Sequence, residues 1–220
     1  MAILPTRNNE ASAPSTCKKR RLLYFPIIHT QADLGELKEV VRQVKARRFG
    51  KYRLRRNQNL IEESWKDIER KLEGLLLQYE TVRVYQDGLP VFGRELDVVG
   101  ELASAGSRNH QLLLRLKEKG ATIMGTESPE LLVEEYQSAK RAFASADTME
   151  AAAIRRRPKT IGDSLLKRRD QFIAARINGT LREHETGLLF LGLFHSVEQW
   201  LDNDIELIYP LGRASAGAGG

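Results

Sequence analysis

LLFLGLF, residues 188–194, is the most apolar stretch of the chain, and it ends at His195. Its length suits a strand, and no polar side chain interrupts it. Strands that are apolar on both faces are typical of the centre of a parallel sheet, which helices cover on both sides. The stretch therefore predicts an α/β fold, with His195 just past its central strand.

Short apolar runs alternate with helical patterns along the rest of the chain. Further strands are predicted at 22–28, 81–86, 121–125 and 205–209. Helical spacing of apolar residues predicts helices at 33–44, 60–77, 94–104, 109–119, 129–143 and 164–181. We therefore expect a single α/β domain with a mainly parallel sheet of about five strands, flanked by helices.

Composition sets the outer bounds of this domain. The chain has 220 residues, of which 41% are apolar, enough for one domain over 21–211. The polar leader, 1–20, and the Gly/Ala/Ser tail, 212–220, are expected to be disordered. Cys17 is the only cysteine, so no intrachain disulfide can form, and a reducing compartment, the cytoplasm, is expected. No apolar run approaches the roughly 20 residues that span a bilayer, so we expect no membrane segment.

Basic residues gather between Lys45 and Arg56 without an acid among them, in a chain of net charge +6. Such a segment can attract an anionic partner. It is also typical of a solvated helix end and loop, and no aromatic residues are spaced there for base stacking. Both interpretations remain open at this point.

Polar side chains follow four of the five predicted strands. These residues are His29, Asp87, Glu127 and His195. Singly, each suits a structural role as a cap, a turn residue or a partner of a helix dipole. Together they predict a site, because ligands of open α/β sheets bind outside the carboxyl ends of the strands. We expect His29, Glu127 and His195 to converge there, with Asp87 close by.

The residue types allow two kinds of chemistry. His29, Glu127 and His195 are ligands suited to a divalent metal such as zinc, manganese or cobalt, which would activate water. Without metal, a histidine would act as general base with a carboxylate partner, Asp87 or Glu127. No nucleophile elbow, Walker loop or dinucleotide-binding glycine pattern is present in the sequence.

The segment Gly192-Leu193-Phe194-His195 forms a G-x-x-H box on a late apolar strand. It resembles the superfamily that joins erythromycin esterases, the ChaN haem-binding proteins and the TraB/Tiki proteins. His29 matches an early strand-end histidine of that group, and the arginine-containing helix at 169–177 is similar as well. The resemblance implies histidine-dependent or metal-dependent hydrolysis, with Arg169 and Arg176 as substrate-binding residues.

Two functions of different classes follow from these patterns. The first is a hydrolase-like enzyme that acts on a small molecule or peptide through His29, Asp87, Glu127 and His195. The alternative is a non-catalytic binding or scaffold protein that meets an anionic partner through Lys45–Arg56.

Overall fold

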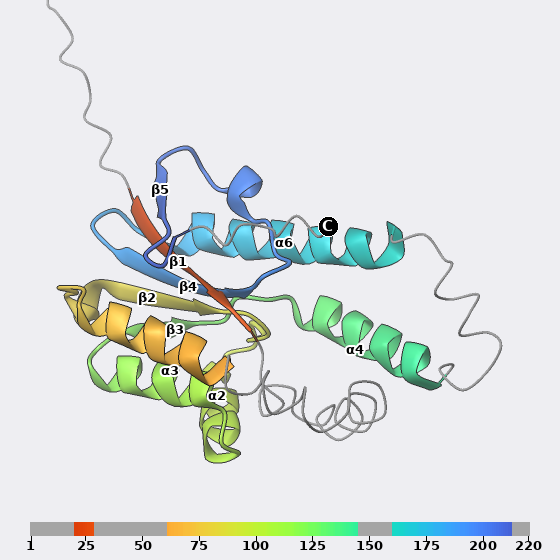
Figure 1. The fold of residues 1–220 in the computed structure, drawn as a ribbon. Helices are drawn as coiled ribbons and strands as arrows, with labels where there is room; N and C mark the ends of the chain where they lie inside the picture. The colour runs from red at the N-terminus through yellow and green to blue at the C-terminus, as the bar shows by residue number, and fades with distance from the viewer. Residues whose placement is uncertain (1–19, 29–60, 145–159, 213–220) are drawn as a thin grey trace, which may run out of the picture.

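A five-stranded parallel sheet forms the centre of the protein (Figure 1). The computed structural model describes residues 20–28, 61–144 and 160–212. The strand order is β3-β2-β4-β1-β5, and every pairing is parallel. The strands are β1 (Arg20–Ile27), β2 (Val82–Gln86), β3 (Thr122–Met124), β4 (Thr186–Gly192) and β5 (Ile205–Ile208). The predicted single α/β domain with a parallel sheet is therefore confirmed.

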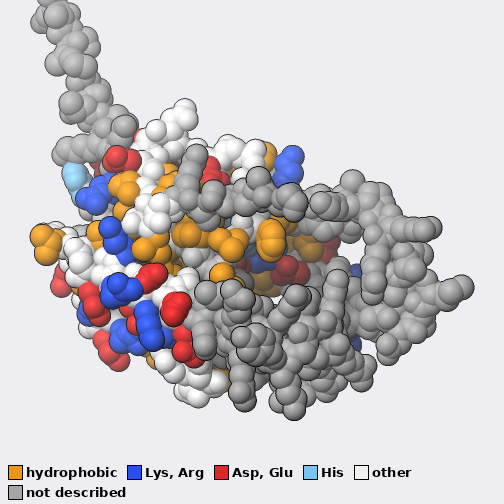
Figure 2. Space-filling model, in the orientation of Figure 1, with side chains coloured by type: hydrophobic (Ala, Val, Ile, Leu, Met, Phe, Trp, Pro, Cys, Tyr) orange, Lys and Arg blue, Asp and Glu red, His pale blue; other side chains and the backbone are white. Residues whose placement is uncertain are grey.

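One face of the sheet is covered by a helix at 61–73 together with α2 (Glu95–Ser104) and α3 (Arg108–Glu118). The helix at 61–73 contributes Trp65, Ile68 and Leu72, one turn apart, to the core on this side. Acidic and basic side chains mix on the outer surface of these helices (Figure 2), where Glu69 pairs with both Arg108 and Arg115.

The other face of the sheet is covered by α6 (Thr160–Thr180) and the short 3-10 helix η4 (Glu198–Trp200). Ile173, Ala174 and Ile177 of α6 are completely buried against this face. Helix α4 (Pro129–Ala144) follows β3 and contacts α6, while the one-turn helix η2 (Tyr79–Thr81) leads into β2.

Strand β4 lies third of the five, between β2 and β1, as its apolar sequence predicts. Its side chains alternate between the two cores, with Phe190 on one side and Leu191 on the other. The strand ends at Gly192, two residues before the end predicted from the apolar run. A turn in which the His195 N–H donates to the Gly192 carbonyl, at 3.1 Å, leaves Phe194 87% exposed.

Other boundaries differ from the predictions by a few residues. β1 begins at Arg20, inside the segment expected to be disordered, because the Arg20 guanidinium binds Asp202 and Asp204. The helix at 61–73 ends before the predicted position 77, and Leu76 is fully exposed. The helix predicted at 33–44 lies outside the described residues. Among the described helices, none combines the length and apolar character needed to cross a bilayer.

Candidate functional site

The carboxyl ends of β2, β3 and β4 bring three of the predicted site residues together. Asp87 follows β2, Glu127 lies in the connection after β3, and His195 follows β4. One ligand atom from each of these side chains lies within 4.8 Å of the others, a spacing at which they could hold a metal ion. His29, the fourth predicted member, lies outside the described residues.

Backbone hydrogen bonds across the strand ends fix the two acids. The Asp87 N–H donates to the Phe190 carbonyl at 2.9 Å, which extends the β2–β4 ladder into the loop. Gly88 then turns the chain with a φ of 76°, which favours glycine, and its N–H donates to Glu127 Oε1 at 3.0 Å. The Glu127 N–H donates to the Leu89 carbonyl at 3.0 Å. Glu127 is thus held by the loop that carries Asp87, and Asp87 is held by the end of β4.

Arg169, from α6, lies between the two acids. Its Nε and Nη2 donate to the two Glu127 oxygens at 2.8 and 2.5 Å, and Nη2 also donates to Asp87 Oδ1 at 2.9 Å. Its Nη1 donates to both oxygens of Glu135, from α4, each at 2.8 Å. All three guanidinium nitrogens therefore donate to carboxylates, and the side chain is only 7% exposed.

His195 is held between two carboxylates. Its Nδ1 lies 2.6 Å from Asp170 Oδ1, and the other Asp170 oxygen accepts the Ser196 N–H at 3.0 Å. Its Nε2 lies 3.4 Å from Asp87 Oδ2, which also accepts the Gly192 N–H at 2.8 Å. Burial by itself lowers the pKa of His195, but Asp170 and Asp87 outweigh that effect and raise it to about 9. The imidazole is therefore protonated at neutral pH.

Burial and pairing also act on the neighbouring groups. Burial raises the pKa of the Glu127 carboxyl, and Asp87 adds to the increase, while the hydrogen bonds from Arg169 oppose it. Burial lowers the pKa of Arg169, but Glu127, Asp87 and Glu135 more than compensate and raise it. Arg169 stays charged and supplies the cation that two buried carboxylates require.

This donor set does not fit a metal ion as the side chains stand. Both Glu127 oxygens and Asp87 Oδ1 accept from Arg169, and Asp87 Oδ2 accepts from Gly192. His195 offers Nε2 toward Asp87, but its pKa of about 9 keeps that nitrogen protonated at neutral pH, and a metal binds only the neutral imidazole. The spacing of the three side chains suits a metal, whereas their present contacts suit an ion-pair network.

Two members of the network were not predicted from the sequence: Asp170 and Glu135. Asp170 carries a recognisable signal, because it precedes Ile173, Ala174 and Ile177 at helical spacing and so lies on the apolar face of α6. An acid on such a face needs a buried partner. Glu135 carries no comparable signal, since its side chain is 51% exposed and it pairs with a residue 34 positions away.

Arg176 lies on α6 about two turns beyond Arg169. Its Nε donates to the Gly125 carbonyl at 3.3 Å, at the end of β3. In the described part of the chain, its hydrogen bonds do not reach Asp87, Glu127 or His195. The substrate-binding roles of Arg169 and Arg176 stay predictions, and the structure gives each of them protein partners.

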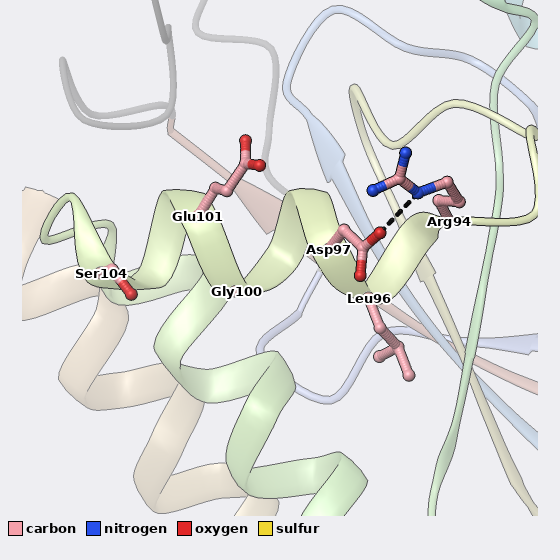
Figure 3. Close-up of a pocket in the computed structure, with 6 residues that line it drawn as sticks. All are labelled: Arg94, Leu96, Asp97, Gly100, Glu101 and Ser104. Atoms are coloured by element: carbon pink, nitrogen blue, oxygen red, sulfur yellow. Dashed lines mark hydrogen bonds and ion pairs between the residues drawn. The ribbon is translucent and has the colours of Figure 1, made fainter.

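A shallow depression on α2 is a separate feature (Figure 3). It is lined by Arg94, Leu96, Asp97, Gly100, Glu101 and Ser104. The one ion pair among these residues joins Arg94 to Asp97, three positions along the chain, and both side chains are more than half exposed. This surface has the character of a solvated helix face.

The basic segment between Lys45 and Arg56 lies outside the described residues, so its expected role toward an anionic partner stays a prediction. Among the described residues, the cluster around His195 is the group whose geometry suits acid–base chemistry. Comparison of the chain with protein-family models, with curated proteins and with solved structures finds no match.

Proposed function

We propose that the cluster is an acid–base site for hydrolysis of an ester or amide bond in a small molecule or peptide. The observation that carries this proposal is the position of His195 at the carboxyl edge of a parallel sheet, with Asp170 at one ring nitrogen and Asp87 at the other. A carboxylate that fixes one imidazole nitrogen leaves the other in a defined orientation for proton transfer. The G-x-x-H resemblance at Gly192–His195 points to the same reaction class.

The proton steps follow from the positions of the groups. The oxygen of a water molecule adds to the substrate carbonyl carbon, and the proton it loses passes to Asp87. The bond to the leaving oxygen or nitrogen breaks, and that atom takes the Nε2 proton of His195. The proton on Asp87 then returns to Nε2, which lies 3.4 Å from Asp87 Oδ2. The sum is one water molecule added across the cleaved bond.

The other members of the cluster would be positioning residues. Asp170 orients the imidazole and favours its protonated form. Arg169 and the Gly192 N–H hold the two oxygens of Asp87, at 2.9 and 2.8 Å. Glu127 in turn holds Arg169. This arrangement requires no metal ion for any step.

The test uses the full chain with p-nitrophenyl acetate, butyrate and octanoate, together with a peptide mixture followed by mass spectrometry. We expect His195→Gln to lower kcat/KM by about 100-fold or more, the usual contribution of a general acid or base. His184→Asn is the matched control, because His184 is exposed and has a φ of 68°, which asparagine tolerates. Equal turnover by wild type and His195→Gln on every substrate would overturn the proposal.

A further inference from the structure

We infer that Arg169 is the built-in cation of the Asp87–Glu127–His195 cluster, and that a divalent metal ion binds there tightly only when the guanidinium is removed. The arginine side chain and a metal would be competing occupants of one site. The inference does not rest on the hydrolytic function, since its test uses no substrate.

The first step is the need for a cation. Asp87 and Glu127 are buried, at 6% and 0% exposure, and both carboxylates contact the same Arg169 nitrogen, Nη2. Two buried carboxylates side by side are strongly disfavoured without a positive partner. The guanidinium meets this need at the place where the carboxylate oxygens converge.

The second step is that the guanidinium is firmly held. Each of its three nitrogens donates to carboxylate oxygens, those of Glu127 and Asp87 on one side and those of Glu135 on the other. A metal ion entering the intact protein would have to take oxygens from these bonds. We therefore expect the wild-type chain to bind divalent metals only weakly.

The third step is what remains after truncation of Arg169. Two carboxylates would then border the vacated space, and the His195 imidazole lies beside Asp87, with one ligand atom of each of the three side chains within 4.8 Å of the others. Two carboxylate oxygens and the neutral imidazole nitrogen form a donor set that zinc, cobalt and manganese accept, with a position left for water. Binding would displace the Nε2 proton of His195 into solvent, so the affinity should rise with pH. The loss of the arginine charge would also leave the carboxylates without a counter-ion, which favours a bound cation.

The experiment compares wild type, Arg169→Ala and Arg168→Ala as full chains without a metal-binding tag. Arg168 is the matched control, because it is the adjacent arginine, pairs with Glu134 and is 53% exposed. Calorimetric titration with cobalt chloride should give one ion per chain for Arg169→Ala, bound on the order of 100-fold more tightly than by wild type. Arg168→Ala should behave as wild type does. Adding Glu127→Gln to Arg169→Ala should abolish the gain.

A second measurement covers the case in which Arg169→Ala does not fold alone. Cobalt, or methylguanidinium as a replacement for the missing side chain, should each restore its near-ultraviolet circular dichroism, and each should weaken binding of the other. Tight one-to-one cobalt binding by the wild-type chain would overturn the inference. So would an Arg169→Ala chain that binds cobalt no better than wild type and is not restored by either cation.

Discussion

Replacement of Asp170 by asparagine tests the most specific electrostatic feature of the site. Asp170 Oδ1 lies 2.6 Å from His195 Nδ1, and its second oxygen accepts the Ser196 N–H at 3.0 Å. Asparagine has nearly the same shape but no charge, and it can offer a carbonyl oxygen to only one of these two donors at full strength. The variant therefore weakens the hydrogen bond that stabilises the protonated imidazole of His195, and it leaves no large cavity.

The expected size of the effect follows from the strength of the bond that is lost. Hydrogen bonds to charged groups contribute about 1.5–3 kcal/mol, and 1.36 kcal/mol corresponds to about one pKa unit. We therefore expect the His195 pKa to fall from about 9 by about 1 to 2 pH units in Asp170→Asn. Asp87 would keep the pKa from falling further, because it remains at the other ring nitrogen.

Proton NMR titration of the imidazole Cε1–H signals measures this change directly. The chain has four histidines, and the His195 signal is assigned as the one absent from the His195→Gln spectrum. Asp97→Asn is the matched control, because Asp97 is an exposed partner of Arg94 on α2 and should leave the His195 pKa unchanged. A wild-type pKa near the ordinary 6.5, or an equal pKa in Asp170→Asn, would refute the electrostatic account of this site.

Two further predictions concern stability. Folding raises the His195 pKa from 6.5 to about 9, so the protonated imidazole stabilises the fold by about 3 kcal/mol; this stabilisation is complete below about pH 6.5 and is lost as the pH rises through 9. In urea unfolding, the difference in free energy of unfolding between wild type and His195→Gln should therefore be smaller at about pH 9.5 than at about pH 6. An equal difference at both pH values would contradict this prediction. Gly187→Ala places a Cβ 2.5 Å from Leu22 Cδ1 and should lower the free energy of unfolding by about 1–3 kcal/mol. Gly179 lies on the exposed side of α6, and no atom lies within 4 Å of the Cβ that Gly179→Ala would add, so this variant should raise the free energy of unfolding by about 0.5–1 kcal/mol. Equal decreases in the free energy of unfolding for both variants would contradict the packing described.

Much of the fold can be predicted from local patterns. The run at 188–194 indicates a strand buried on both faces, and β4 lies at the centre of the sheet. Gly120 suits a helix end, and it has a φ of 110° directly after α3 and its C-cap. The order of the strands cannot be predicted in this way. Apolar side chains require burial, but they do not specify that β4 lies between β1 and β2.

Part of the site can also be predicted from local sequence patterns. Asp87, Glu127 and His195 each follow a strand, so a parallel sheet brings them to one edge. The contacts that set their chemistry come from α6, and the sequence does not specify where along the sheet this helix lies. Asp170 is separated from His195 by 25 positions and Arg169 from Asp87 by 82, and each bond depends on how α6 rests against the sheet. The exposure of Phe194 likewise depends on a turn that its apolar neighbours do not predict.

Arg169 and Asp170 are consecutive residues, so their side chains leave α6 about 100° apart. One reaches the acids after β2 and β3, and the other reaches the histidine after β4. Their directions are fixed by Ile173, Ala174 and Ile177, which are buried in the sheet core. A single residue inserted between Asp170 and Ile173 would rotate the pair by about 100° and shift it by about 1.5 Å, separating both halves of the network. Length changes in this helix should therefore be tolerated before Arg169 and not between Asp170 and Ile177.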